Sequence, residues 1–357
     1  MPSFDADSVA AVLREFQDPE TGRGIGALGQ LKNVRITDDL LAVDLGLTSW
    51  GAPLADETRQ ACEALLKSSF PNARKVEVKI VPHERPADKI GQIGLTAKSV
   101  IAVGSGKGGV GKSTLATMIA LGLKREGCKV GIMDADVYGP SVPHLLGVTE
   151  RPTAINNRLQ PIDKEGLKVM SMGLLVPPGE AVVWRGPMLH GAVTQFLRDT
   201  NWGDLDYLII DMPPGTGDIA LTLSQLLPLT GAVVVCTPQD VALLDAVKAI
   251  AMFRKVNIPL LGLVENMSYF LCPDNNKRYD IFGCGGAKAK AAELSVPFLG
   301  DVPINIDLRK RGDDGATDGN YDDEAVAKYF QDICRNVVRN VATARALSPP
   351  LPSLPVL

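Results

Sequence analysis

The sequence has few aromatic side chains, few histidines and no long apolar run, and each shortage excludes a class of protein. Aromatic residues make up 5% of the 357 residues, so the chain is poorly suited to stacking nucleic-acid bases. The three histidines, His83, His144 and His190, are far apart in the sequence, which argues against a histidine-based metal site. No stretch of about 20 apolar residues is present, so we expect no membrane-spanning helix.

Cysteine and positive charge are limited as well. The six cysteines contain no CxxC pair and are too sparse for a disulfide scaffold. The formal net charge is −4 and no run of four or more Lys or Arg occurs, so neither nucleic acid nor an anionic membrane is an expected partner. The first residues, MPSFDADSVAAVLREF, lack a basic segment followed by an apolar one, so no secretory signal is expected. These features predict a cytoplasmic protein with reduced thiols.

The order of apolar and polar segments predicts two domains. Residues 1–82 have helical patterns near 8–16 and 58–70 and strand patterns near 34–47 and 76–81, which indicates a small α+β domain. Residues 83–97 begin with a polar, proline-containing stretch and are expected to form a linker. Residues 98–346 are expected to form the second domain, and residues 347–357 a proline-rich tail.

Short apolar strands alternate with helices in the second domain. Strands are expected at residues 99–103, 130–133, 207–210, 232–236 and 260–264. Continuous apolar strands that alternate with helices indicate an α/β fold with a mostly parallel sheet covered on both faces. The helix expected at residues 323–346 carries one apolar stripe, which favours packing against the core.

A glycine-rich segment has the GxxxxGK[ST] pattern from Gly106 to Ser113. It follows an expected strand and precedes an expected helix at residues 115–126, which is the context of a phosphate-binding P-loop. In such a loop, backbone N–H groups converge on phosphate oxygens, Lys112 reaches the β and γ phosphates, and Ser113 supplies a hydroxyl to Mg²⁺. A glycine-rich turn without a ligand is the alternative, and the strand and helix context favours the P-loop. The residues expected to surround the nucleotide are Gly106, Lys107, Gly108, Gly109, Val110, Gly111, Lys112, Ser113 and Thr114.

Two aspartates follow apolar strands of the same expected sheet. Asp136 comes shortly after residues 130–133, and Asp211 directly follows residues 207–210. Because the carboxyl ends of parallel strands meet at one edge, Asp211 is expected to hold Mg²⁺ and Asp136 to orient or activate the attacking water. The alternative is that such aspartates cap helices or turns, and for Asp218 the two interpretations are equally good.

The glycine loop with its additional Lys107 resembles the deviant Walker A motif of the MinD/ParA/nitrogenase-iron-protein class. Further motifs resemble the Mrp/ApbC family of P-loop ATPases, described as iron–sulfur cluster carriers, over about residues 98–310. They are DADVYGPS at 134–141, WRGPM at 184–188, DMPPGTGD at 211–218, TPQD at 237–240 and VENMSYF at 264–270. Residues 5–82, with Asp18-Pro19-Glu20 and the segment 45–54, resemble the MIP18-like (DUF59) domain.

This resemblance implies a function and roles for matching residues. The chain would bind and hydrolyse ATP with Mg²⁺ and carry iron–sulfur clusters to apoproteins. Lys107 would be a catalytic residue that reaches the ATP of the partner subunit in a homodimer. Lys112, Asp136 and Asp211 would be the other catalytic residues. Asn266 would hydrogen-bond the adenine, and residues 134–141 and 211–218 would be the two switch segments. A [4Fe–4S] cluster would bridge the dimer through two thiolates from each subunit.

Two departures from the family pattern leave the cluster site open. The family's CPxC pair reads Cys272-Pro273-Asp274-Asn275 here, so the second cysteine is absent. Cys284 follows later and would be the second ligand if residues 277–280 form a hairpin. In the N-terminal domain, Gly51-Ala52-Pro53-Leu54 lacks the usual cysteine. The alternatives are therefore an ATP-dependent adaptor without a cluster, or a positioning ATPase of the MinD/ParA type. The proline-rich tail and the lack of basic runs argue against the latter.

Overall fold

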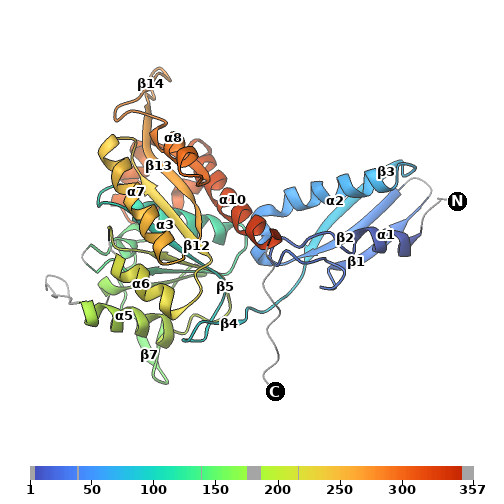
Figure 1. Cartoon of the computed structure of the whole chain (residues 1–357), viewed down its shortest axis with the longest axis horizontal. Coiled ribbons are helices and arrows are strands. Elements are labelled where there is room, and N and C mark those ends of the chain that lie inside the picture. The colour runs from blue at the N-terminus through green and yellow to red at the C-terminus, as the bar shows by residue number, and fades with distance from the viewer. Residues whose placement is uncertain (1–4, 38–39, 138, 175–185, 216, 348–357) are drawn as a thin grey trace. The chain divides into compact units, whose positions relative to one another are not determined.

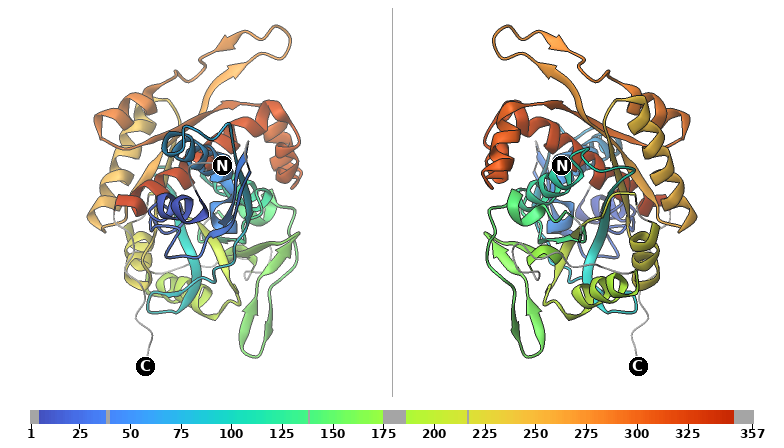
Figure 2. Two further views of the ribbon diagram at one scale, coloured as in Figure 1. Left: turned by 90° about the vertical axis from the view of Figure 1, so that its right-hand side faces the viewer. Right: turned by 90° about the vertical axis from the view of Figure 1, so that its left-hand side faces the viewer.

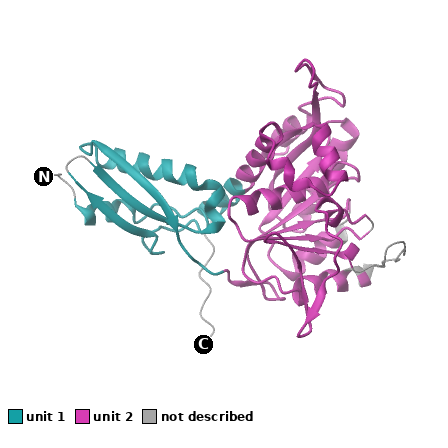
Figure 3. Ribbon diagram, turned by 180° about the vertical axis from the view of Figure 1, so that it is seen from behind, with its two compact units in different colours: residues 1–86, 338–357 teal, residues 87–337 magenta. Residues whose placement is uncertain are grey.

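The computed structural model describes residues 5–37, 40–137, 139–174, 186–215 and 217–347. The chain divides into two compact units, which Figure 3 distinguishes by colour. Unit 1 comprises residues 1–86 and 338–357, and unit 2 comprises residues 87–337. The end of the last helix therefore packs with the N-terminal residues, whereas the sequence pattern placed the whole of residues 98–346 in the second domain.

Unit 1 is a three-stranded sheet with two helices. Its elements are α1 (Ala6–Leu13), β1 (Leu31–Ile36), β2 (Leu40–Leu47), the 3-10 helix η1 (Ser49–Leu54), α2 (Ala55–Ser69) and β3 (Lys75–Pro82). Strand β2 lies in the middle, antiparallel to β1 and parallel to β3. Leu41, Val43 and Leu45 of β2 pack with Leu13 of α1 and Leu66 of α2. This arrangement confirms the small α+β fold predicted for the N-terminal residues.

A buried ionic network holds the loop after α1 in unit 1. The carboxylate of Asp18 is fully buried and lies 2.9 Å from Nη1 of Arg85, which is also 3.2 Å from Oε1 of Glu20. Arg345, near the end of the last helix, donates to the carbonyl oxygen of Glu20 at 2.6 Å and lies 4.8 Å from the ring of Trp50. These contacts explain why residues 338–347 belong to unit 1.

Unit 2 is built on a ten-stranded sheet with helices on both faces (Figure 1). The main strand order is β14-β13-β12-β5-β11-β6-β10-β9, while β15 pairs with β13 and β4 with β5. The strands of this sheet are β4 (Lys89–Ile90), β5 (Leu95–Ser105), β6 (Val130–Asp134), β9 (Ile162–Lys164), β10 (Leu167–Ser171), β11 (Leu205–Asp211), β12 (Gly231–Cys236), β13 (Leu260–Leu271), β14 (Arg278–Tyr279) and β15 (Phe298–Ile304). A separate hairpin is formed by β7 (Thr153–Ile155) and β8 (Arg158–Gln160).

The helical segments of unit 2 connect these strands. They are α3 (Lys112–Arg125), α4 (Val142–Leu145), η2 (Met172–Leu174), α5 (Gly186–Asp199), α6 (Gly217–Leu226), α7 (Asp240–Lys255), α8 (Gly286–Glu293), α9 (Ile306–Asp313), η3 (Thr317–Tyr321) and α10 (Glu324–Leu347), which continues into unit 1. The apolar stripe predicted on α10 is buried, since Phe330, Ile333 and Val337 are all 0% exposed. No helix among the described residues combines the length and the apolar character needed to cross a bilayer.

The central strands of unit 2 are parallel, as predicted. β5 pairs in parallel with β11 and β12, β6 with β10 and β11, and β13 with β12 and β15. Every residue of β6, β11 and β12 is buried, which is why their sequences are continuous apolar runs. The sequence pattern missed β10, whose apolar run is interrupted by Lys168, and the short or half-buried strands β4, β7, β8, β9 and β15. β13 is also longer than predicted and extends with β14 into a hairpin (Figure 2).

Candidate functional site

The glycine loop lies where β5 ends and α3 begins. Gly109 and Gly111 have φ angles of +78° and +80°, a conformation that glycine adopts without the strain of a Cβ atom. At Gly106 an added Cβ would overlap the backbone carbonyl of Asp245, so the loop passes too close to α7 for any side chain. The loop therefore leads directly into the N-terminus of α3, where unpaired N–H groups favour an anion.

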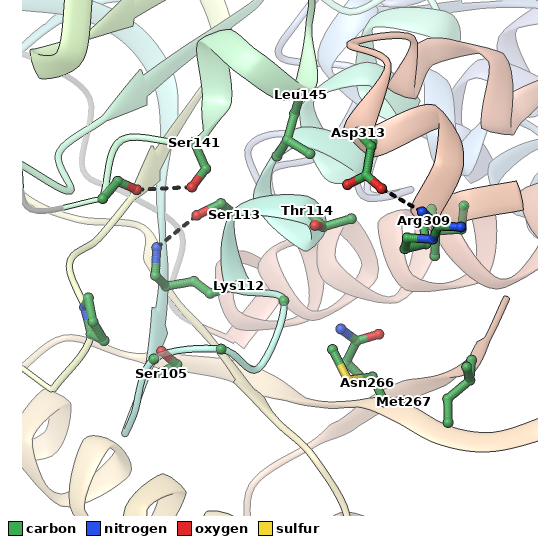
Figure 4. A pocket seen from close by; sticks show the side chains of 18 of the residues that line it. Ser105, Lys112, Ser113, Thr114, Ser141, Leu145, Asn266, Met267, Arg309 and Asp313 are labelled. Carbon is green, nitrogen blue, oxygen red and sulfur yellow. Dashed lines mark hydrogen bonds and ion pairs between the residues drawn. The ribbon is translucent and has the colours of Figure 1, made fainter. Parts of the chain in front are cut away.

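Lys112 connects this loop to the two predicted aspartates. Its ammonium lies 2.5 Å from Oδ1 of Asp211, 3.8 Å from Oδ2 of Asp136 and 3.2 Å from the hydroxyl of Ser113. The lysine side chain is only 6% exposed and that of Asp211 is fully buried. The structure thus brings four sequence-predicted site residues, Lys112, Ser113, Asp136 and Asp211, into one cluster (Figure 4 labels the first two).

A third carboxylate, that of Asp134, lies behind this cluster. It accepts hydrogen bonds from the backbone N–H groups of Asp136 (3.0 Å) and Val142 (3.2 Å) and from the hydroxyl of Ser171 (3.1 Å). Burial, and next the charge of Asp211, raise the pKa of Asp134 to about 7. Burial also raises the pKa of Asp211, although Lys112 opposes that shift. The site therefore holds more negative charge than its one lysine balances, which favours binding of a cation.

The side chains at this point suit Mg²⁺. The second carboxylate oxygen of Asp211, Oδ2, is buried and has no hydrogen-bond partner among the described residues. The hydroxyl of Ser113 lies in the same cluster, 3.2 Å from the Lys112 ammonium that contacts the other oxygen of Asp211. A carboxylate oxygen and a hydroxyl are hard oxygen ligands of the kind that Mg²⁺ prefers beside phosphates. Ser113 and Asp211 thus fit the metal that the sequence predicted for them.

A cavity of about 960 Å³ opens from the glycine loop. Its lining includes Lys107, Lys112 and Thr114 as well as Leu308 and Arg309 of α9. Figure 4 labels Lys112, Thr114 and Arg309 around this cavity. This volume is large enough for a nucleotide. Gly108, Gly109, Gly111, Ser113, Asp136 and Asn266 also line the cavity, whereas Gly106 and Val110 belong to the loop without lining it.

Lys107 and Asn266 are two further predicted site residues beside the glycine loop. Lys107 lines the cavity, and no ion pair within the described ranges involves its ammonium. Asn266 lies at the cavity edge (Figure 4), and its side-chain amide donates to the carbonyl oxygen of Val110 at 2.9 Å. In this structure Asn266 therefore supports the loop, and its predicted contact with adenine stays a prediction.

The two candidate cluster cysteines lie on the β13–β14 hairpin and the segment that follows it. Cys272 is half-buried, and its N–H donates to the carbonyl oxygen of Lys277 at 3.0 Å. Cys284 is exposed, and its thiol lies 3.3 Å from Oδ2 of Asp280. The hairpin that the sequence suggested is present, but its register places Cys272 opposite Lys277 and not opposite Cys284.

Some motif residues lie outside the described residues. These are Tyr138 in the first switch segment, Thr216 in the second, Trp184 and Arg185 in the WRGPM motif, and the proline-rich tail from residue 348. Among described residues, the sequence did not identify the cavity walls formed by Ile281, Phe282 and Arg309. Those residues belong to no recognisable motif, and only the fold brings them to the glycine loop.

Comparison with protein families gives two matches. Residues 96–338 match a family described as NUBPL iron-transfer P-loop NTPase, and residues 6–80 match one described as iron–sulfur cluster assembly protein. An iron–sulfur cluster carrier protein from Synechocystis is 43% identical over 352 residues, which cover 95% of this chain and 98% of that protein. A protein of the same name from Deinococcus radiodurans is 44% identical, and the match covers 98% of this chain and 99% of that protein. The iron–sulfur cluster transfer protein NUBPL of Dictyostelium discoideum is 48% identical, with 68% and 77% covered.

Solved structures resemble unit 2. A nucleotide-binding protein from Archaeoglobus fulgidus in complex with ADP is 41% identical with a TM-score of 0.56, and the match covers 62% of this chain and 88% of that one. The cell division ATPase MinD of Pyrococcus furiosus is 20% identical with a TM-score of 0.51, and the match covers 67% of this chain and 98% of that one. The second likeness concerns the fold alone, and it agrees with the parallel P-loop sheet predicted from the sequence.

Proposed function

The chain belongs to the NUBPL iron-transfer P-loop NTPase family, as its motifs indicated, and we propose that it hydrolyses ATP to carry iron–sulfur clusters to apoproteins. One observation carries this proposal: Lys112, which pairs with the buried Asp211, and Asp136 line a nucleotide-sized cavity whose lining also includes Ile281 and Phe282, just before Cys284. The close relatives named as cluster carriers, and the ADP in the Archaeoglobus protein, support it.

The proposed ATP site uses Lys112 as its main cation. Before nucleotide binds, Lys112 neutralises the buried Asp211 at 2.5 Å. When ATP enters, its phosphates accept backbone N–H bonds from the glycine loop and attract the Lys112 ammonium. The Lys112 ammonium then neutralises Asp211 less fully. Asp211 and Ser113 would hold Mg²⁺, which would supply compensating positive charge at the phosphates. Binding of nucleotide and of metal would thus be coupled through one lysine.

Hydrolysis needs a water in line with the γ-phosphate. It also needs positively charged groups beside the phosphate oxygens that gain negative charge in the transition state. Asp136 lies 3.8 Å from Lys112 and lines the cavity, so we assign it to orienting that water. Lys107 also lines the cavity, and by resemblance to its family it would reach the ATP of a second subunit. A cation that arrives only in the dimer would stabilise the developing charge and make hydrolysis depend on dimerisation.

The cluster is the proposed cargo and would be held on the hairpin. Cys272 and Cys284 are the two cysteines with accessible side chains, whereas Cys62, Cys128, Cys236 and Cys334 are buried. Burial raises the pKa of Cys62, Cys236 and Cys334 to about 12, which disfavours the thiolate that iron requires. Cys272 and Cys284 from each of two subunits would give the four thiolates of a [4Fe–4S] cluster in a homodimer.

An ATP-dependent adaptor without a cluster is the second candidate. It is favoured by the missing second cysteine of the CPxC pattern and by the hairpin register, which places Cys272 opposite Lys277. In the described part of one chain, no group of three or more His, Cys, Asp or Glu could hold a metal ion. A bridged dimer requires only two ligands per chain, so this observation does not weaken the cluster carrier.

Anaerobic reconstitution with iron and sulfide separates the two candidates. A carrier binds about four irons per dimer with visible absorbance, and Cys272→Ala and Cys284→Ala should each reduce that iron at least by half. Cys62→Ala, which alters a buried thiol, is the matched control and should retain the iron. Wild-type protein that stays colourless while it hydrolyses ATP would favour the adaptor.

A further inference from the structure

A buried glutamate lies in the middle of β13, between the nucleotide cavity and the cysteine segment. Glu265 is 0% exposed. Its Oε1 accepts from the hydroxyl of Ser268 at 2.5 Å and from the N–H of Gly285 at 2.9 Å. Its Oε2 accepts from the N–H of Ala287 at 2.8 Å. The carboxylate is therefore held by three donors, two of them backbone groups at the start of α8.

The glutamate acts as the N-terminal cap of α8 from outside the helix. Gly285 is the residue before the helix, has a φ of +73° and provides no side chain for capping. A carboxylate at this end satisfies unpaired N–H groups and interacts favourably with the helix dipole. Since Cys284 directly precedes Gly285, the position of the exposed thiol depends on this cap.

The next residue on β13 holds the phosphate loop. Asn266 donates to the carbonyl oxygen of Val110, and its amide fills the space beside Gly111. Neighbouring side chains on a strand point to opposite faces of the sheet. Asn266 therefore contacts the glycine loop on one face, and Glu265 contacts the start of α8 on the other. A shift of that stretch changes the glycine loop and the Cys284 segment together.

The backbone immediately after Asn266 is irregular. Met267 has a φ of +55°, which is uncommon for a residue with a side chain, and it lines the nucleotide cavity. The pairing of β13 with β15 shifts register between Asn266 and Phe270. Such bulges concentrate beside functional sites, where the chain has more than one local arrangement available.

We propose that Glu265 is a positioning residue that couples nucleotide binding in the cavity to the placement of Cys284. The coupling runs from the glycine loop through Asn266 to Glu265, and from its carboxylate to Gly285 and Ala287. This proposal rests on the proposed function, in which Cys284 holds cargo, but its test requires neither iron nor hydrolysis.

Hydrogen exchange of the full chain, with and without saturating Mg²⁺ and ADP, measures the coupling. In wild-type protein we expect ADP to change the exchange rate of the amides of residues 284–289 by about fivefold or more, the low end of coupling between sites. Glu265→Gln should abolish this response, because an amide NH₂ cannot accept from all three donors. Glu293→Gln is the matched control, since Glu293 lies at the other end of α8, is exposed and pairs with Lys290.

The ratio of exchange rates with and without ADP discriminates the proposal from a purely structural role. If Glu265 only caps α8, Glu265→Gln would raise the exchange rates of residues 284–289 but leave the ratio of rates with and without ADP unchanged. That outcome overturns the proposal. An absent ADP response in wild-type protein that binds ADP overturns it as well, while the cluster-carrier function stays open to its own test. If Glu265→Gln does not fold, Ser268→Ala removes one donor and keeps the carboxylate. A smaller ADP response in that variant supports the coupling, and an unaltered one refutes it.

Discussion

Replacing Lys112 by alanine tests the site most severely, because one side chain serves both stability and catalysis. In the nucleotide-free protein its ammonium is the cation beside Asp211, at 2.5 Å, and beside Asp136, at 3.8 Å. Removal leaves Asp211 as a buried carboxylate without a neutralising partner. The same removal deprives ATP of the charge that holds its β and γ phosphates.

The size of each effect follows from burial. Breaking a buried ion pair by removing one partner costs about 3–5 kcal/mol, because the remaining charge is not compensated. Burial already raises the pKa of Asp211, and without Lys112 that pKa rises further. A carboxyl whose folded pKa is raised loses stability as the pH rises above its unfolded pKa, and the loss is complete above the folded pKa, so the loss should be largest at pH 8 and smaller at pH 5. For hydrolysis we expect a loss of about 10²–10³-fold, as for other preorganised charges on a transition state.

Urea unfolding at pH 5 and pH 8, with ATP hydrolysis measured on the same samples, provides the assay. Lys248→Ala is the control, because Lys248 forms an exposed pair with Asp245 at 2.9 Å and should contribute no more than about 1 kcal/mol. The double variant Lys112→Ala, Asp211→Asn should recover stability at pH 8, since it removes the uncompensated charge. It should not recover hydrolysis.

Two results would refute this reasoning. A Lys112→Ala protein as stable as Lys248→Ala at pH 8 would show that Asp211 is not a buried charge neutralised by Lys112. Hydrolysis within about threefold of wild type would show that the ATP site does not use the loop lysine.

Three further predictions concern neighbouring groups. Lys107→Ala should lower kcat for ATP about 10²-fold with little change in KM, and nearly unchanged kcat would exclude its role on the transition state. Because burial raises the pKa of Asp134 to about 7, stability from this group is present below about pH 4 and is lost as the pH rises toward 7. Asp134→Asn should therefore gain up to about 3 kcal/mol relative to wild type between pH 5 and pH 8 in urea unfolding, and a constant difference would contradict the shift. Arg85→Met leaves the buried Asp18 unpaired and should cost about 3–5 kcal/mol, and a loss below 1 kcal/mol would show that the network in unit 1 is dispensable.

The phosphate site could be predicted from the sequence because its functional side chains belong to short, continuous motifs. Lys112 and Ser113 follow the glycines at fixed spacing, and Asp136 and Asp211 follow apolar strands. Parallel strands of a covered sheet end at one edge, so these separate motifs had to converge. The structure places the lysine between the two aspartates, as that argument requires.

The remainder of the site depends on contacts between distant segments. Glu265 is visible in the sequence as a charge at the end of an apolar strand, but its partners Gly285 and Ala287 carry no side-chain signal. Arg309 reaches the cavity from a short polar helix that resembles many surface helices. The end of α10 likewise joins unit 1 through Arg345, whose partners lie near the start of the chain. Periodicity identifies such elements without showing where they pack.

Cluster transfer to an apoprotein tests the central claim most directly. The protein is reconstituted anaerobically with iron and sulfide and mixed with a [4Fe–4S]-dependent apoenzyme, and recovery of that enzyme's activity is followed with ATP, without ATP and for Lys112→Ala. We expect the wild-type protein to activate the apoenzyme faster with ATP than without it, and ATP to cause no such acceleration for Lys112→Ala. Activation at one rate in all three cases, or none in any of them, would contradict an ATP-driven cluster carrier.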